Sequence, residues 1–140
     1  MKLSECVKEC GFYKMVWRNH SQNEAEQVEV KSLAFDSRSV DKGALFFCLV
    51  GEKAGNEFAL QAVERGAVGV VCERELELDI PQIIVPSSRE ALSLISANFF
   101  NNPSKHLKII GITGTNGKAT TSYMLASILR GAGKRVGIIG

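Results

Sequence analysis

Hydrophobic and polar positions in the first third of the chain predict one short helix and two strands. Apolar residues recur every three or four positions over 3–10, as on one face of a helix, and a glycine follows them. The polar stretch 18–27 predicts a loop. Apolar and charged residues alternate at the start of 28–35 and predict a half-buried strand, whereas the apolar run 44–50 between two glycines predicts a buried strand.

The middle of the chain predicts a strand–helix–strand unit and then a further strand and helix. Apolar residues share one face of a helix over 58–66, which a glycine ends, and the run AVGVVC at 67–72 predicts the next strand. The run QIIV at 82–85 lies between two prolines and predicts another strand. Ser87 and Glu90 have the spacing of a capping box, and they predict the start of a helix.

The sequence Asn-Asn-Pro-Ser at 101–104 predicts a boundary between two domains. Proline disfavours helical geometry at the residue before it, and a new apolar segment starts after a short polar link. We therefore expect an N-terminal domain over 1–103 and the beginning of a second, truncated domain over 104–140.

The second region has the pattern of a parallel nucleotide-binding sheet. An apolar strand over 107–112, a glycine-rich loop, a helix over 118–130 and an apolar strand over 136–139 follow one another, as in an opening βαβ unit. The fold class predicted for the chain is α/β, with an N-terminal α/β domain followed by the first βαβ unit of a P-loop-type, parallel-sheet ATP-binding domain.

Composition and charge narrow the classes of function. The 140 residues are 45% hydrophobic and 23% charged with a formal net charge of +2, which is typical of a folded globular protein. So small an excess of positive charge is not typical of a nucleic-acid-binding protein, and we expect no nucleic-acid partner. The apolar runs are far shorter than the roughly 20 residues that span a bilayer, and the N-terminus lacks a secretory signal. We expect a cytoplasmic protein with no membrane partner.

Cysteines and histidines provide no strong candidate for metal binding or catalysis. The four cysteines include no CxxC pair, and Cys48 and Cys72 lie in apolar runs, which favours packed thiols over metal or redox sites. Cys6 and Cys10 share a helix face, but two ligands alone make a poor zinc site. The two histidines are isolated in polar stretches, and we expect both to be solvated. We assign no metal ligand and no catalytic residue.

The stretch GITGTNGKATT at 111–121 is the strongest candidate site. A glycine-rich turn between a strand and a helix directs backbone N–H groups at a phosphate, and the helix dipole adds partial positive charge. Lys118 would reach the terminal phosphates as a mobile cation. A tight turn without a ligand also uses glycines, but the Gly-Lys pair at the helix start favours phosphate binding. The spacing is not that of the standard P-loop pattern, because Ile112 stands where that pattern has its first glycine.

The sequence TGTNGK after an apolar strand resembles the ATP loop of the Mur ligase family. The segments NNPSKHLKIIGITGTNGK and LRGAGKRVGIIG resemble the junction and first central-domain βαβ unit of MurE-type ligases. The segment DSRSVDKGALFFCLVG resembles the first domain shared by MurE-type and MurF-type enzymes, which binds the UDP end of the substrate. The resemblance covers about 26–140 and implies a Mur ligase N-terminal substrate-binding domain. Thr-Asn before Gly-Lys favours the MurE type.

The resemblance assigns residues to two ligands. The ATP loop corresponds to Gly114, Thr115, Asn116, Gly117, Lys118, Ala119 and Thr120. From the residues alone, the triplet Asp36-Ser37-Arg38 predicts an Asx turn at a strand end with a surface arginine. The resemblance implies in addition that Ser37 contacts the UDP-sugar substrate.

Two departures from the family pattern stand out. The family usually has Thr or Ser directly after the lysine, where a hydroxyl serves Mg²⁺ and the phosphates, but Ala119 offers no oxygen. We therefore expect weakened Mg-ATP binding, with Lys118 and backbone contacts retained. The loop Gly51–Phe58 also lacks the usual Asp and is one residue short, which affects contacts on the uracil side.

The resemblance implies an ATP-dependent ligase of peptidoglycan precursor synthesis, which adds an amino acid to UDP-MurNAc-L-Ala-D-Glu. ATP phosphorylates a substrate carboxylate in this family, and an incoming amine then forms the amide bond. We expect these 140 residues alone to have no ligase activity, because most of the central domain and the C-terminal domain are not in the sequence. The alternatives are a degenerate UDP-sugar-binding remnant, an interaction module and part of a MurF-type ligase.

Overall fold

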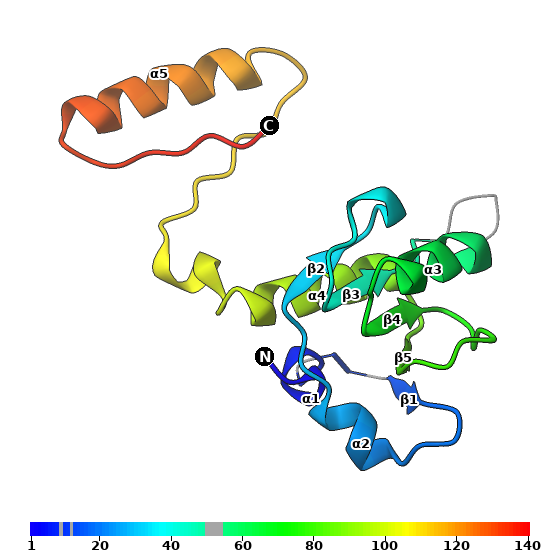
Figure 1. Ribbon diagram of the computed structural model, residues 1–140. Coiled ribbons are helices and arrows are strands. Elements are labelled where there is room, and N and C mark those ends of the chain that lie inside the picture. Colours follow the sequence, from blue (N-terminus) through cyan, green and yellow to red (C-terminus); the bar gives the residue numbers. More distant parts are fainter. Residues whose placement is uncertain (9, 12, 50–54) are drawn as a thin grey trace. The chain divides into compact units, whose positions relative to one another are not determined.

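The computed structural model describes four stretches of the chain, residues 1–8, 10–11, 13–49 and 55–140 (Figure 1). The chain divides into two compact units, Met1–Pro103 (unit 1) and Ser104–Gly140 (unit 2). The end of the strand predicted over 44–50 and the shortened loop after it fall largely on positions 50–54, outside the described residues.

Unit 1 is built on a five-stranded sheet with the strand order β1-β5-β4-β3-β2. Four neighbouring strands are parallel, and β1 pairs with the β5 edge in the antiparallel direction. The strands are β1 Lys14–Val16, β2 Ser32–Ala34, β3 Ala44–Phe47, β4 Gly69–Cys72 and β5 Gln82–Ile84. The predicted α/β fold class is confirmed.

Helices cover both faces of this sheet (Figure 1). The helices of unit 1 are α1 Leu3–Cys6, α2 Gln22–Gln27, α3 Gly55–Glu64 and α4 Ser88–Phe99, and η1 Ser37–Ser39 is a short 3₁₀ turn. Residues of α1 and α4 pack on one face in the first hydrophobic cluster, and residues of α3 pack on the other face in the second. Because both faces are covered, the central strands β3 and β4 are buried along their whole length, as expected of parallel sheets.

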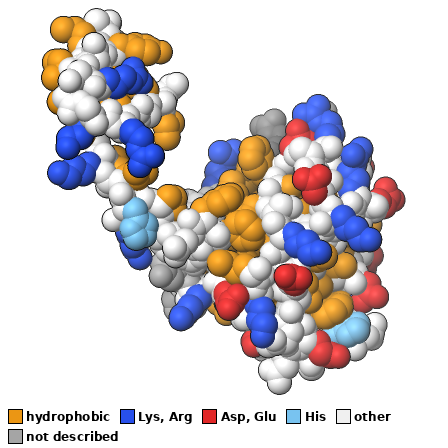
Figure 2. Space-filling view, turned by 60° about the vertical axis from the view of Figure 1, so that its left-hand side comes forward, with side chains coloured by type: hydrophobic (Ala, Val, Ile, Leu, Met, Phe, Trp, Pro, Cys, Tyr) orange, Lys and Arg blue, Asp and Glu red, His pale blue; other side chains and the backbone are white. Residues whose placement is uncertain are grey.

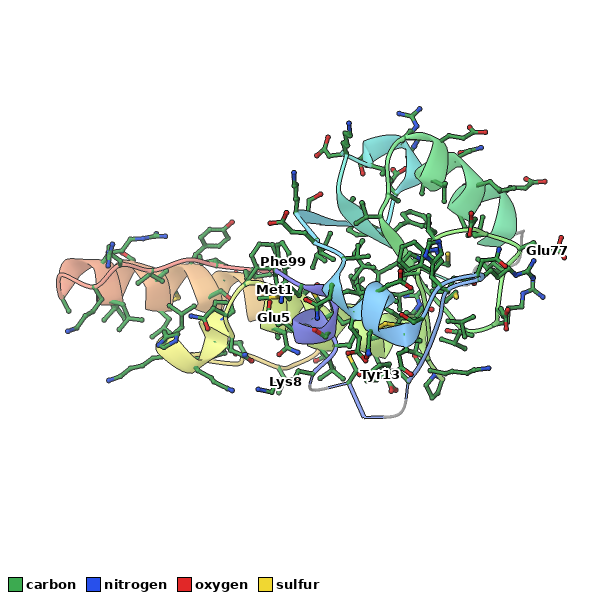
Figure 3. The ribbon with its side chains drawn as sticks, turned by 60° about the horizontal axis from the view of Figure 1, so that its bottom comes forward. Met1, Glu5, Lys8, Tyr13, Glu77 and Phe99 are labelled. Carbon is green, nitrogen blue, oxygen red and sulfur yellow. The ribbon has the colours of Figure 1, made fainter. Side chains whose placement is uncertain are left out.

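Side chains of successive strand residues point to opposite faces, so each central strand contributes to both clusters. In β3, Leu45 and Phe47 belong to the first cluster, and Phe46 belongs to the second. A hydrogen bond from Asn98 Nδ2 to the Cys6 backbone oxygen, 3.1 Å long, joins the end of α4 to α1. Figure 3 shows Phe99, the last residue of α4, beside Met1 and Glu5 at the N-terminus. The first cluster therefore ties the N-terminal segment to the sheet.

Most predicted helices and strands of unit 1 are present, with shorter bounds. Gly66 follows α3 with a φ of +104°, where an added Cβ would lie 3.1 Å from the Lys42 Cα, so a glycine is required there. The Ser87 side chain accepts a hydrogen bond from the Glu90 N–H, 3.3 Å long, and Ser87 is the N-cap of α4 as predicted. The strand predicted over 28–35 is formed only at β2.

Two elements of unit 1 are absent from the sequence predictions. The loop predicted over 18–27 is wrong, because α2 forms there with a capping box between Ser21 and Glu24. The edge strand β1 was not predicted, and its three residues take strand geometry by pairing with β5. Both elements are short: α2 depends on its capping box, and β1 depends on pairing with the distant strand β5.

Unit 2 contains the helix α5 Lys118–Gly131, as predicted, and the short 3₁₀ turn η2 Pro103–His106 begins at the last residue of unit 1. The strands predicted over 107–112 and 136–139 are wrong for this structure, because neither segment has strand pairing within 104–140, all of which is described. An apolar segment becomes a strand only where a neighbour supplies backbone hydrogen bonds. Within the described residues, no helix has both the length and the apolar character needed to cross a membrane.

A buried glutamine fixes the acidic segment between β4 and β5. Gln82 is fully buried, and its side-chain amide forms three hydrogen bonds with backbone groups of Leu76 and Leu78. Its Oε1 accepts from the Leu76 N–H at 2.8 Å, and its Nε2 donates to the backbone oxygens of Leu76 at 2.9 Å and Leu78 at 3.3 Å. Since Leu76 and Leu78 are also buried, these backbone groups have little access to water.

We expect Gln82→Leu to lower the free energy of unfolding by about 3 kcal/mol, because it leaves buried backbone groups unpaired. Urea unfolding of the 140-residue chain measures the change. Gln22→Leu on the exposed face of α2 is the matched control and should change the stability little. Equal stabilities of the two variants would contradict this role of Gln82.

Candidate functional site

The triplet Asp36-Ser37-Arg38 forms a tight turn directly after β2. Asp36 is the N-cap of η1, and its Oδ1 accepts a hydrogen bond from the Arg38 N–H at 2.9 Å. This is the Asx turn that the residue types predict. The turn leaves the Arg38 side chain exposed and buries the Ser37 side chain.

An ion pair closes the same turn. The Arg38 guanidinium donates from Nη2 to Asp36 Oδ2 at 2.7 Å and from Nε to Oδ1 at 3.0 Å. Hydrogen bonds from the Arg38 side chain, and then from its backbone N–H, lower the pKa of Asp36 from 3.8 to about 2. Asp36 is therefore ionised across the physiological range, and Arg38 neutralises most of its charge.

Two side chains hold this turn, one on α3 and one directly after it. The Ser37 hydroxyl donates a hydrogen bond to Gln61 Oε1 at 3.1 Å. Arg65 Nη1 donates to the Arg38 backbone oxygen at 3.2 Å. These two contacts fix where Ser37 lies relative to the sheet.

A groove of about 590 Å³ opens beside Ser37. Its lining residues come from the turn after β2, from β3 and the residues after it, and from α3, and they are Phe35, Asp36, Ser37, Arg38, Phe46, Phe47, Cys48, Leu49, Phe58 and Gln61. The aromatic rings of Phe35 and Phe58 are 64% and 49% exposed, which is unusual for phenylalanine. The groove lies at the carboxyl ends of β2 and β3, where open parallel sheets bind their ligands.

The glycine-rich loop of unit 2 ends at the start of α5. Gly117 is the N-cap of α5 with a φ of +74°, a left-handed conformation that glycine adopts without strain. The first N–H groups of a helix have no partner within the helix, and Gly117 has no side chain to cap them. These N–H groups therefore face a position suited to an anion.

Lys118 extends back over this loop. Its Nζ donates a hydrogen bond to the Gly114 backbone oxygen at 2.7 Å, so the ammonium group lies close to the loop. Ala119 and Thr120 are exposed in the first turn of α5, and Ser122 Oγ donates to the Lys118 backbone oxygen at 2.8 Å. The loop therefore combines backbone donors with one cation, and the nearest hydroxyl after the lysine belongs to Thr120.

The charged side chains of unit 2 are all positive. Residues 104–140 contain no aspartate or glutamate, and their basic side chains are Lys105, Lys108, Lys118, Arg130, Lys134 and Arg135. Figure 2 shows Lys and Arg side chains on this unit, whereas unit 1 carries both signs. A uniformly positive field favours a phosphate-bearing ligand and adds to the effect of the helix dipole.

The thiols are buried in the core, and Cys48 also lines the groove of unit 1. All four cysteines are buried and free, and burial raises the pKa of Cys48 to about 12 and those of Cys6 and Cys72 to about 11. Such thiols remain protonated and unreactive at neutral pH. In the described part of the chain, no three His, Cys, Asp or Glu side chains come together as metal ligands. His20 is exposed, as predicted, and stacks on Trp17 with ring centres 3.9 Å apart.

The structure has Ser37 in the turn after β2 and the loop 114–120 before α5. Sequence reasoning did not single out Gln61 or the two exposed phenylalanines. Gln61 lies 24 positions after Ser37, and no local pattern indicates their contact. Phe35 and Phe58 fit the helix and strand patterns as ordinary core residues. Their exposure is visible only in the folded unit.

We expect the Asp36 carboxyl to titrate at about 2 in the folded chain, and Arg38→Gln to raise this pKa toward 3.8. The folded-state pKa is depressed, so the ion pair stabilises the fold fully above 3.8 and loses its effect as the pH falls through about 2. Carboxyl ¹³C shifts measured against pH report the value. An Asp36 pKa that is the same in both proteins would contradict the ion pair.

Comparisons with known proteins give the same family for the whole chain. A family model described as "Mur ligase family, catalytic domain" matches residues 29–100, just over half of the chain. The UDP-N-acetylmuramoyl-L-alanyl-D-glutamate--2,6-diaminopimelate ligase of Geobacillus thermodenitrificans is 46% identical over 113 residues, which are 80% of this chain and 23% of that protein. The ligase of the same name from Bacillus velezensis is also 46% identical, over 85% of this chain and 24% of that protein.

Solved structures agree. MurF from Acinetobacter baumannii aligns with a TM-score of 0.65 and 30% identity, over 91% of this chain and 26% of that chain. A solved UDP-N-acetylmuramoyl-L-alanyl-D-glutamate--2,6-diaminopimelate ligase shares the fold with a TM-score of 0.74 at 22% identity, over 100% of this chain and 27% of that one. The chain thus spans about a quarter of the length of the relatives it matches. The protein described here belongs to the Mur ligase family.

Proposed function

We propose that the chain is the N-terminal part of a MurE-type ligase, which adds an amino acid to UDP-MurNAc-L-Ala-D-Glu in peptidoglycan precursor synthesis. The observation that carries this proposal is Ser37, buried in the wall of a groove at the carboxyl ends of two parallel strands. The names of the sequence relatives favour the MurE type over the MurF type. They also suggest 2,6-diaminopimelate as the amino acid added.

The groove of unit 1 is proposed to bind the uridine diphosphate end of the substrate. Its exposed phenylalanine rings offer flat apolar faces to a base, and base–aromatic stacking is worth about 1–3 kcal/mol per base. Ser37 lines the same groove and would supply one directed hydrogen bond to the ligand. Unit 1 would then be the substrate-binding domain, over 1–103.

The loop of unit 2 is proposed to bind the phosphates of ATP, as the start of the central domain over 104–140. The backbone N–H groups after Gly117 and the Lys118 ammonium suit the triphosphate. ATP supplies a phosphoryl group that activates a substrate carboxylate in this family. Ala119 supplies no ligand for Mg²⁺, and the Thr120 hydroxyl is one position later on the helix, so metal-assisted binding should be weak.

The partners and location follow from this role. A UDP-MurNAc-peptide is the proposed partner, with ATP and Mg²⁺ as the second ligand pair, and the cytoplasm is the compartment that holds such nucleotides. Neither nucleic acid nor a membrane is part of the proposal. The 140 residues by themselves are proposed to have no ligase activity.

A UDP-sugar-binding protein without ligase chemistry is the second candidate, and Ala119 is the observation that favours it. A working ligase needs Mg-ATP, whereas a binding protein tolerates the loss of the hydroxyl after the lysine. The turn and groove of unit 1 are intact and serve either role. Measured affinities for the two ligands separate the candidates.

UDP-MurNAc-L-Ala-D-Glu should stabilise the 140-residue chain against heat, since a ligand at 100 times its Kd adds about 2.7 kcal/mol to the stability. We expect Ser37→Ala to weaken this binding about tenfold through the loss of one hydrogen bond. Ser93→Ala, on the exposed face of α4, is the matched control. No stabilisation of the unaltered chain, or equal binding by both variants, would contradict the assignment of the groove.

Ala119→Thr should raise the affinity for Mg-ATP about tenfold, because it returns a hydroxyl to the first turn of α5. Without Mg²⁺ the gain should be small. Ala132→Thr, at the other end of the helix, adds the same group far from the loop and serves as control. Calorimetric titration with and without Mg²⁺ gives the four affinities, and an unchanged affinity of Ala119→Thr would count against the role given to this position.

A further inference from the structure

The Ser37 hydroxyl has one proton, and this proton forms the hydrogen bond to Gln61. The Ser37 Oγ donates to Gln61 Oε1 at 3.1 Å, and the Ser37 side chain is only 5% exposed. A serine hydroxyl offers one donor and two acceptor positions. With its proton used by Gln61, Ser37 presents acceptor positions to a ligand in the groove.

The position of Gln61 is set by the helix on which it lies. Ala59 and Ala62 of α3 are fully buried in the second hydrophobic cluster, so the helix backbone is anchored to the sheet. Arg65, one turn after Gln61, donates to the Arg38 backbone oxygen at 3.2 Å. The Gln61 amide therefore meets Ser37 at a fixed place, although its own side chain reaches the surface.

We propose that Gln61 is a positioning residue for substrate binding. It holds the Ser37 hydroxyl as a hydrogen-bond acceptor, so that Ser37 selects an N–H or O–H donor on the uridine and not a phosphate oxygen, which can only accept. The exposed Phe35 and Phe58 line the same groove and favour the uridine as the part of the ligand nearest Ser37. The inference rests on the proposed function, in which the groove binds a uridine diphosphate sugar.

A double-mutant cycle on the 140-residue chain separates positioning from a purely structural role. Gln61→Leu, Ser37→Ala and the double variant are titrated with UDP by calorimetry, and Gln22→Leu on α2 is the matched control. If Gln61 acts through Ser37, each single variant binds UDP about tenfold more weakly, and the double variant binds no more weakly than Ser37→Ala. The control binds as the unaltered chain does.

The outcomes that overturn the inference are distinct from failure of the proposed function. The positioning role alone is refuted if Gln61→Leu binds UDP as tightly as the unaltered chain. It is also refuted if Gln61→Leu weakens UDP binding by the same factor in the Ser37→Ala background as in the unaltered chain. Absence of UDP binding by the unaltered chain refutes the proposed groove, and the positioning role with it. Urea unfolding of each variant shows whether a loss of binding reflects a loss of folding.

Three UDP analogues test the acceptor role of Ser37. Methylation at uracil N3, removal of the 2′-hydroxyl and removal of the 3′-hydroxyl each delete one donor of the uridine. If Ser37 accepts from one of these donors, the analogue that lacks this donor binds the unaltered chain about tenfold more weakly than UDP does. Neither Ser37→Ala nor Gln61→Leu then weakens the binding of this analogue further, whereas both weaken the binding of the other two. If the two variants weaken the binding of all three analogues as much as that of UDP, Ser37 does not accept from the uridine and the proposal is wrong.

Discussion

The parallel pairing of β2, β3 and β4 is the constraint on which the site of unit 1 depends. Parallel strands place all their carboxyl ends at one edge of the sheet, so the residues after β2 and β3 meet there although the chain separates them. The crossover through α3 returns the chain over the same face and brings Gln61 to Ser37. Burial of both sheet faces holds this edge in place, because moving a central strand out of the sheet would expose apolar side chains on both of its faces.

The two units offer different chemical groups to a ligand. Unit 1 forms a groove with exposed rings and one directed hydroxyl, which suits a base and a sugar. Unit 2 uses the free N–H groups of a helix start, a lysine and a wholly positive set of side chains, which suits phosphates. Asp36 and Arg38 neutralise each other in unit 1, so its groove does not depend on net charge to select a ligand.

Sequence patterns predicted the elements whose signals are local. The apolar run of β4 and the cap at Ser87 each identify an element without reference to distant residues. The helix α2 was missed because it is short and polar, although Ser21 and Glu24 carry the capping signal that identified α4. The edge strand β1 depends on β5, and such pairing over many positions cannot be read from a three-residue segment.

The candidate sites were predicted in part for the same reason. The loop before Lys118 is a local motif, and its helix starts where the sequence predicts. Residue types alone indicated only a turn at Asp36–Arg38, and the family resemblance was needed to assign Ser37 to a ligand. The contact with Gln61 joins a turn to a helix across 24 positions, so only the fold reveals it.

We propose that one chain carries two ligand sites, a groove for a uridine diphosphate sugar in unit 1 and a phosphate-binding loop in unit 2. A map of backbone amide shifts from the ¹⁵N-labelled chain, titrated first with UDP-MurNAc-L-Ala-D-Glu and then with ATP, tests it most directly. We expect the first ligand to shift amides at 35–38 and on α3, and the second to shift amides at 114–120. Shifts at the same residues with both ligands, or at neither set, would contradict the assignment of the two sites.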